Sequence, residues 1–184
     1  MFSRQNTHAQ RTNVMRWLKR IFLALIAGAA VILASPLLLA GLVLLGLAYL
    51  FRRECEIVAA QNFRRKYSPA GKDLLLVYSN SPHWQHYVET EWLPRWGPRA
   101  VVLNWTQRRQ WQGSAPEVRL FREFVGGGGF SREYNPVAVI VPPRGRRVHI
   151  VRFWRAFRDY KHGRTRRLRE AEAELERGLA TVQS

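Results

Sequence analysis

An uncharged run near the start of the chain limits what this sequence can fold into more than any other feature. It extends over thirty-one residues, from Ile21 to Phe51, and is almost entirely apolar. As one α-helix it would be about 46 Å long, whereas a bilayer core is about 30 Å thick and is crossed by about 20 apolar residues. A small soluble protein has no interior for such a helix. The run therefore predicts a transmembrane segment at 21–51.

The manner of crossing is open between two alternatives. Pro36 lies near the middle of the run and removes a backbone donor, so it could kink a single tilted span or turn a short hairpin. The positive-inside rule does not decide between them, because residues 1–20 and residues 52–66 each carry five basic side chains. The run is also about twice as long as the apolar region of a cleaved signal peptide, so we expect it to remain as an anchor.

This segment divides the chain into four predicted parts. They are a basic N-terminal tail at 1–20, the transmembrane segment at 21–51, a juxtamembrane linker at 52–71 and a soluble domain at 72–180. The formal net charge is +17, and basic domains are attracted to anionic headgroups. We therefore expect a location at the inner (cytoplasmic) membrane, with the soluble domain on the cytoplasmic side.

The soluble part predicts an α/β fold. Apolar runs bounded by turn residues predict buried strands at 73–79 and 100–105, and residues 135–154 predict an antiparallel hairpin. Helical patterns occupy the sequence between and after these strands, with a glycine run at 126–129 as a flexible connection. The predicted helices are 83–96, 115–125 and 155–179. This alternation predicts a sheet with helices on both faces.

That order of elements, with Pro136 directly before the hairpin, resembles the thioredoxin-like fold over residues 72–180. In that family the turn after the first strand carries a redox CxxC motif. Here the corresponding residues are Ser81, Pro82, His83 and Trp84, and the only cysteine is Cys55. Serine cannot form a mixed disulfide. The resemblance therefore implies a domain without thiol–disulfide exchange, in which Pro136 matches the family's cis-proline.

A catalytic or metal site in the same region is the alternative reading. His83, His86 and Glu89 can share one helix face, and Ser81 precedes them. Zinc catalysis would need a third ligand and an open position that nothing in the sequence supplies. Ser81 lacks the elbow motif of a nucleophile and suits a helix N-cap. We therefore assign no catalytic, cofactor or metal residues, and expect no enzymatic activity and no cofactor.

Basic residues interleaved with aromatic ones are the remaining candidate for function. The segments NWTQRRQW and RFWRAFRDYKHGRTRR can contact anionic partners, and tryptophan and arginine are enriched at protein interfaces. With seven tryptophans in the chain, several are expected to lie outside the core. The predicted interaction residues are Trp17, Trp92, Trp96, Trp111, Arg108, Arg109, Arg164, Arg166 and Arg167.

These features together predict a non-catalytic, membrane-anchored accessory subunit that stabilises or organises a larger membrane complex. A respiratory or photosynthetic complex is one setting that suits this role, and nothing in the sequence selects it. The expected partners are membrane lipids and other subunits, and not nucleic acid. Two alternatives stay open: a binder of anionic lipid or nucleic acid, and a membrane-associated enzyme that uses the region from Ser81 to Glu89.

Overall fold

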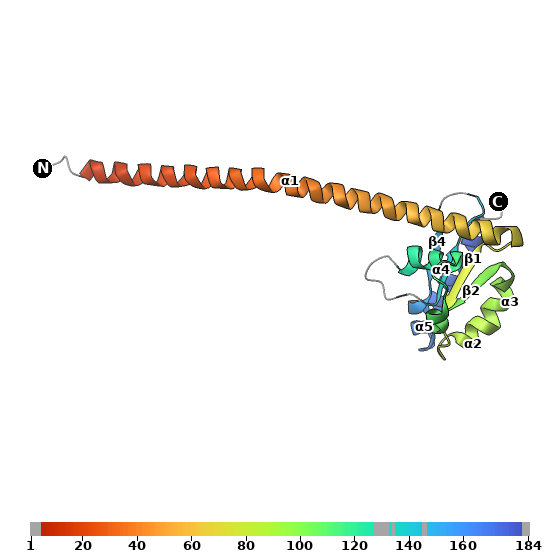
Figure 1. Cartoon of the computed structure of the whole chain (residues 1–184). Helices are drawn as coiled ribbons and strands as arrows, with labels where there is room; N and C mark the ends of the chain where they lie inside the picture. Colours follow the sequence, from red (N-terminus) through yellow and green to blue (C-terminus); the bar gives the residue numbers. More distant parts are fainter. Residues whose placement is uncertain (1–4, 127–132, 134, 145–146, 182–184) are drawn as a thin grey trace. The chain divides into compact units, whose positions relative to one another are not determined.

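The computed structural model describes the backbone of residues 5–126, 133, 135–144 and 147–181 (Figure 1). Within the first helix, the side chains at 5–16, 18, 27–35 and 37 are not described. The chain divides into two compact units, Met1–Phe51 and Arg52–Ser184. Part of the glycine run, at 127–129, lies outside the described residues.

The first helix, α1 (Gln5–Tyr67), is continuous and contains Pro36 in its interior. The hairpin alternative is therefore wrong, because the backbone does not turn at this proline. The helix ends at Tyr67, two residues before Pro69. After Tyr67 a short 3-10 turn, η1 (Ser68–Ala70), leads to Gly71, whose left-handed backbone conformation (φ 71°) reverses the chain.

The predicted transmembrane segment is corrected by the structure. Among the described residues, no helix is both long enough and apolar enough to cross a membrane. Residues 27–35 and 37 of the predicted segment lie outside the described side chains. The predicted inner-membrane location depended on that segment and is overturned with it.

The second unit contains a four-stranded mixed sheet in the order β2-β1-β3-β4 (Figure 1). Strand β1 pairs in parallel with β2 and antiparallel with β3, and β3 pairs antiparallel with β4. These strands lie within the predicted strand regions, so the α/β class follows from the structure as from the sequence. Their bounds are β1 (Leu74–Tyr78), β2 (Ala100–Asn104), β3 (Val137–Ile140) and β4 (His149–Arg152).

Helices cover both faces of the sheet, which explains why β1 and β3 are apolar throughout. Leu74 and Leu76 of β1 face one core cluster, while Leu75 and Val77 face the other. The second cluster includes side chains from the end of α1, and Phe63 there is fully buried. The predicted linker at 52–71 thus contributes buried side chains to the domain core.

The helical segment after β1 departs from regular α-helical geometry at its centre. It consists of α2 (Gln85–Tyr87), the π-helical η2 (Val88–Trp92) and α3 (Leu93–Trp96). The N–H of Leu93 bonds to the carbonyl of Val88, five residues earlier. Pro94 has no N–H to donate, and the widened turn before it lets the helix continue past the proline.

The last predicted helix is divided into two in the structure. Gly163, with φ 77°, turns the chain after α5 (Trp154–Tyr160), and α6 (Arg166–Thr181) follows. The apolar stripe of α6 is buried at Leu168, Leu175 and Leu179. The remaining elements are η3 (Gly97–Arg99), η4 (Trp105–Gln110), α4 (Pro116–Phe121) and η5 (Arg122–Gly126).

A partly buried ion pair joins the starts of the first two strands to the last helix. Arg99 Nε and Nη2 donate to the two carboxylate oxygens of Asp73 at 3.1 and 2.5 Å. Arg99 Nη2 also donates to the carbonyl oxygen of Leu179 at 3.3 Å. Asp73 is only 8% exposed, and removing one partner of such a pair would leave the other charge uncompensated. The contacts are structural and lie at the start of the strands.

Candidate functional site

The carboxyl end of β1 meets the segment before β3, where the resemblance to thioredoxin-like proteins places an active site. The Asn135–Pro136 peptide bond is cis. Ser79 Oγ donates to Asn135 Oδ1 at 3.0 Å and accepts from the indole N–H of Trp84 at 3.3 Å. The serine is thus held between two neutral groups. No base lies in these contacts to remove its proton.

A second set of neutral side chains links β1 to β2 at the same edge. Asn104 Nδ2 donates to Asn80 Oδ1 at 2.6 Å, and Asn104 Oδ1 accepts from the backbone N–H of Thr106 at 2.9 Å. The hydroxyl of Thr106 accepts from the N–H of Asn80 at 3.0 Å. These groups bond to one another and hold the loops in place. They supply neither an acid nor a base.

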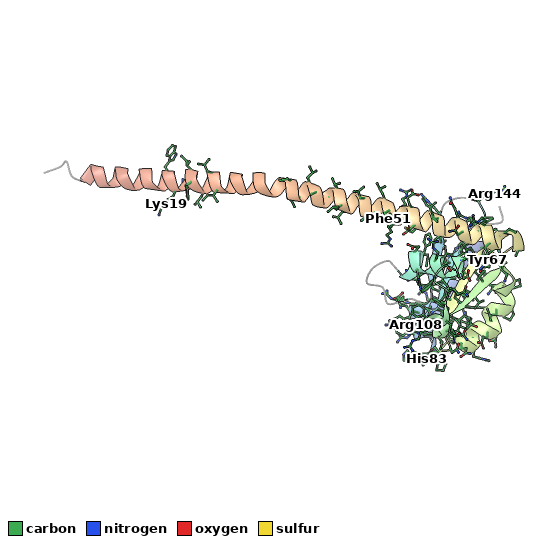
Figure 2. All side chains as sticks on the ribbon, in the orientation of Figure 1. Lys19, Phe51, Tyr67, His83, Arg108 and Arg144 are labelled. Atoms are coloured by element: carbon green, nitrogen blue, oxygen red, sulfur yellow. The ribbon has the colours of Figure 1, made fainter. Side chains whose placement is uncertain are left out.

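The histidines and the glutamate predicted to share a helix face are exposed and do not form a site together. His83 lies at the domain surface (Figure 2), and its N–H bonds weakly to Ser81 Oγ at 3.4 Å. Glu89 Oε1 accepts from Gln85 Nε2 at 3.1 Å. Among the described residues, no three metal-ligating side chains are close enough to hold an ion. Ser81 lies four residues before α2 begins at Gln85, and its backbone carbonyl oxygen accepts from the N–H groups of Trp84 and Gln85, so it is not the N-cap, which is Trp84.

A hollow lies beside this region, between the start of α2 and one face of α5. Its volume is about 190 Å³. The α5 side chains that line it follow the spacing i, i+3, i+4 and i+7, which places them on one helix face. The lining residues are His83, Trp84, Trp154, Phe157, Arg158 and Lys161.

Aromatic packing forms the floor of this pocket. Phe157 is fully buried. Its ring centroid lies 6.1 Å from that of Trp84 and 5.5 Å from that of Tyr87, with the latter pair edge to face. These are favourable distances for aromatic pairs. The floor is therefore held by contacts between two segments more than seventy residues apart in the chain.

Two cations stand at the rim of the pocket. The guanidinium of Arg158 lies 5.2 Å from the ring centroid of Trp154, within the range of a cation–π contact. Lys161 lies three residues further along the chain, directly after the last residue of α5, and both side chains are exposed. Neither has an ion-pair partner among the described residues. Their charges are therefore accessible to an anionic ligand.

The four tryptophans predicted to make interactions differ in how far they are exposed. Trp92 and Trp96 are 1% and 4% exposed, so their assignment to the surface is wrong. They follow Val88 at intervals of four residues, which places all three on the inner face of the helix. Trp111 is half-buried and packs edge to face against Phe121, with ring centroids 5.5 Å apart. Trp17, in the first unit, is 63% exposed.

The five predicted arginines are all exposed, but several have contacts within the domain. Arg166 pairs with Glu170 at 2.7 Å, and Arg167 pairs with Asp159 at 2.9 Å. Arg108 (Figure 2) donates to the carbonyl oxygen of Trp105 at 3.3 Å. Such exposed pairs contribute about 0–1 kcal/mol each. Arg109 and Arg164 are exposed as predicted, without a distinguishing feature.

Sequence reasoning missed four of the pocket residues, Trp154, Phe157, Arg158 and Lys161. They lie in RFWRAFRDYKHGRTRR, which was interpreted as one basic and aromatic stretch. Their shared helical spacing was a usable signal. The other wall, from His83 and Trp84, could not have been paired with them from the sequence, because the contact is long-range.

Comparisons with protein-family models, with curated proteins and with solved structures each found no match. The resemblance to the thioredoxin-like fold therefore stays a prediction from the order of elements and Pro136, and the function has to be argued from the chain's own surfaces.

Proposed function

We propose that this protein is a non-catalytic accessory subunit that binds and stabilises a larger protein assembly. The observation that carries the proposal is the surface of α1 between Leu38 and Phe51. The large apolar side chains of this segment are between 54% and 72% exposed. They are Leu38, Leu39, Leu42, Val43, Leu44, Leu45, Leu47, Tyr49, Leu50 and Phe51.

This segment has no polar face. The four consecutive residues 42–45 are all large, apolar and exposed, and successive residues of a helix point about 100° apart. Together they cover nearly the whole circumference. An apolar surface of this extent is typical of an interaction site. We propose that side chains of partner subunits cover it.

Charge favours a different protein over a second copy of this chain as the partner. The net charge of +17 makes copies repel one another, because self-repulsion grows with net charge. An acidic or neutral partner surface would not be repelled. The contacts among Ser79, Asn80, Asn104 and Thr106 support a non-catalytic role, since they use neutral side chains to fix loops.

The first test is purification of the tagged full-length chain from the cells that produce it. Size-exclusion chromatography at low and high salt, followed by quantitative mass spectrometry, measures what elutes with it. We expect one set of proteins at a constant ratio to the chain at both salt concentrations, because apolar contacts are not screened by salt. Recovery of the chain alone, or with lipid or nucleic acid only, would overturn the proposal.

A double variant tests whether the apolar segment makes the contact. Leu42→Glu with Leu44→Glu places charges on a surface that the proposal buries, where an unpaired carboxylate is costly. We expect the co-eluting protein to fall by about tenfold or more. Gln107→Glu with Gln110→Glu adds the same charge at exposed positions of η4 and serves as the matched control. Both variants should unfold at the wild-type temperature, because neither changes a buried residue.

A further inference from the structure

The pocket between α2 and α5 is apolar inside and basic at its rim. We infer that it binds an acidic segment of a partner protein, which inserts one large apolar side chain between the aromatic rings while its carboxylates pair with Arg158 and Lys161. The inference deepens the proposed function and rests on it, since the ligand is a polypeptide of the assembly.

The size of the pocket favours a single side chain as its occupant. Its volume of about 190 Å³ is below the roughly 300–1,000 Å³ of pockets that enclose cofactors and drug-sized ligands. Protein interfaces commonly use a pocket of this kind to receive one aromatic or aliphatic anchor. Trp84, Trp154 and Phe157 provide the apolar walls for it.

The charges at the rim determine the expected sequence around that anchor. Arg158 and Lys161 lie one turn apart on the exposed side of α5, and no acidic side chain among the described residues pairs with them. By contrast, the neighbouring Arg155 pairs with Glu133 at 2.6 Å. Carboxylates on both sides of the anchor would therefore meet two available cations, which increases specificity and the rate of association.

A single-stranded nucleic acid is a weaker fit to the same residues. Base stacking uses open ring faces along a groove. Here Phe157 is fully buried, and the guanidinium of Arg158 lies over the ring of Trp154.

The test uses the full-length protein and a fluorescein-labelled peptide, acetyl-DEDFDEDG-amide, with fluorescence anisotropy at low ionic strength as the readout. We expect saturable binding. Replacing the phenylalanine of the peptide by alanine should weaken binding by about tenfold or more, because the anchor supplies most of the buried area. The neutral peptide NQNFNQNG lacks the carboxylates and should also bind about tenfold more weakly.

Protein variants locate the site. Arg158→Glu with Lys161→Glu should weaken binding of the acidic peptide by about tenfold or more. Arg109→Glu with Arg119→Glu changes the net charge equally at exposed positions elsewhere and should retain most of the binding. Circular dichroism confirms that both variants are folded. Equal losses in the two variants would mean that only the overall charge is recognised, and would overturn the inference.

Three further outcomes would also overturn it. They are the absence of saturable binding, displacement of the peptide by oligo(dT) at an equal concentration of charge, and binding of free N-acetyl-phenylalanine as tight as that of the peptide. The second would indicate a nucleic-acid site, and the third a small-molecule site.

Failure of this inference is distinguishable from failure of the proposed function. If Arg158→Glu with Lys161→Glu abolishes peptide binding but leaves the native assembly intact, the inference that the ligand is a polypeptide of the assembly is overturned, while the proposed function stands. If the wild-type chain elutes without any stoichiometric protein, the proposed function fails whatever the peptide does.

Discussion

At the scale of single residues, the clearest polar contact is a carboxylate that receives two neutral donors. Glu172 Oε1 accepts from the hydroxyl of Tyr87 at 2.9 Å and from the indole N–H of Trp92 at 2.8 Å. Burial, and then the hydrogen bond to Glu172, raise the pKa of Tyr87 well above its usual value. Burial is also the first cause of the raised pKa values of Tyr67 and Tyr78.

These raised pKa values predict a loss of stability in alkaline solution. The unfolded chain loses its tyrosine protons near the ordinary pKa of 10.0, while the folded protein retains them to higher pH. The unfolded state then binds fewer protons, so the free energy of unfolding falls as pH rises above that value. Urea unfolding between about pH 9 and about pH 11 measures the fall.

The variant Tyr87→Phe tests whether Tyr87 contributes to this loss of stability. It loses one hydrogen bond and is expected to be about 1 kcal/mol less stable at neutral pH. Above the tyrosine pKa, its free energy of unfolding should fall less steeply with pH than that of the wild type. Tyr49→Phe, at an exposed position of α1, is the control and should keep the wild-type slope. An unchanged slope in Tyr87→Phe would contradict the prediction.

Gly178 is a second residue whose identity matters, because α6 approaches β3 closely there. A Cβ at this position would collide with Cδ1 of Ile140, a side chain that is only 1% exposed, and would lie 3.4 Å from His149 Cδ2. We expect Gly178→Ala to destabilise the domain by about 1–3 kcal/mol through overpacking, despite the better helix propensity of alanine.

A double-mutant cycle isolates this contact. Ile140→Val removes Cδ1, so the combined variant should be more stable than the sum of the single effects by about 1 kcal/mol. Gly46→Ala, where no atom lies within 4 Å of the added Cβ, is the control and should not lower stability. Additive effects of the two core substitutions, measured by urea unfolding, would show that the side chains do not collide.

At the scale of elements, the end of α1 is the segment whose role differs most from expectation. Ala59, Ala60 and Phe63 are buried against the sheet. Arg64 Nε donates to the carbonyl oxygen of Pro142 at 2.6 Å, and Tyr67 donates to Glu117 at 2.7 Å. Residues predicted as a linker thus cover one face of the sheet beside α4.

Alanine substitutions on this helix measure its contribution. Phe63→Ala should lower the free energy of unfolding by about 3–5 kcal/mol, the usual cost of removing a buried phenylalanine. Val58→Ala, at a position that is 40% exposed, should change it by less than about 0.5 kcal/mol. Similar small effects at both positions in thermal or urea unfolding would place 52–67 outside the cooperative core.

The helices also show how far local sequence can predict an element. The strands follow from apolar runs, and the spacing within 115–125 predicts five inward side chains, of which Val118, Leu120, Phe121 and Val125 are buried and Phe124 is half-buried. The break at Gly163 and the π-helical turn before Pro94 were not predicted. Pro94 and Gly163 both disfavour a helix, but the helix continues past Pro94 and the chain turns at Gly163. Tertiary packing determines which of these two outcomes occurs.

At the scale of the whole molecule, the chain divides at residue 51 into two units, and the two proposals concern different units. The assembly proposal depends on the exposed apolar surface at 38–51. The peptide proposal depends on a pocket within the folded domain. Because the substitutions that test them lie in separate units, each experiment can change one surface and leave the other intact.

The sequence by itself determined the α/β class, the two central strands and the absence of a cysteine pair for disulfide exchange. These depend on composition and on short-range periodicity, which a chain carries before it folds. The tertiary structure alone decided that the predicted linker contributes buried side chains to the core, and that the start of α2 meets α5 to form a pocket. Long-range pairing depends on how elements far apart in sequence pack together, and no local pattern specifies that.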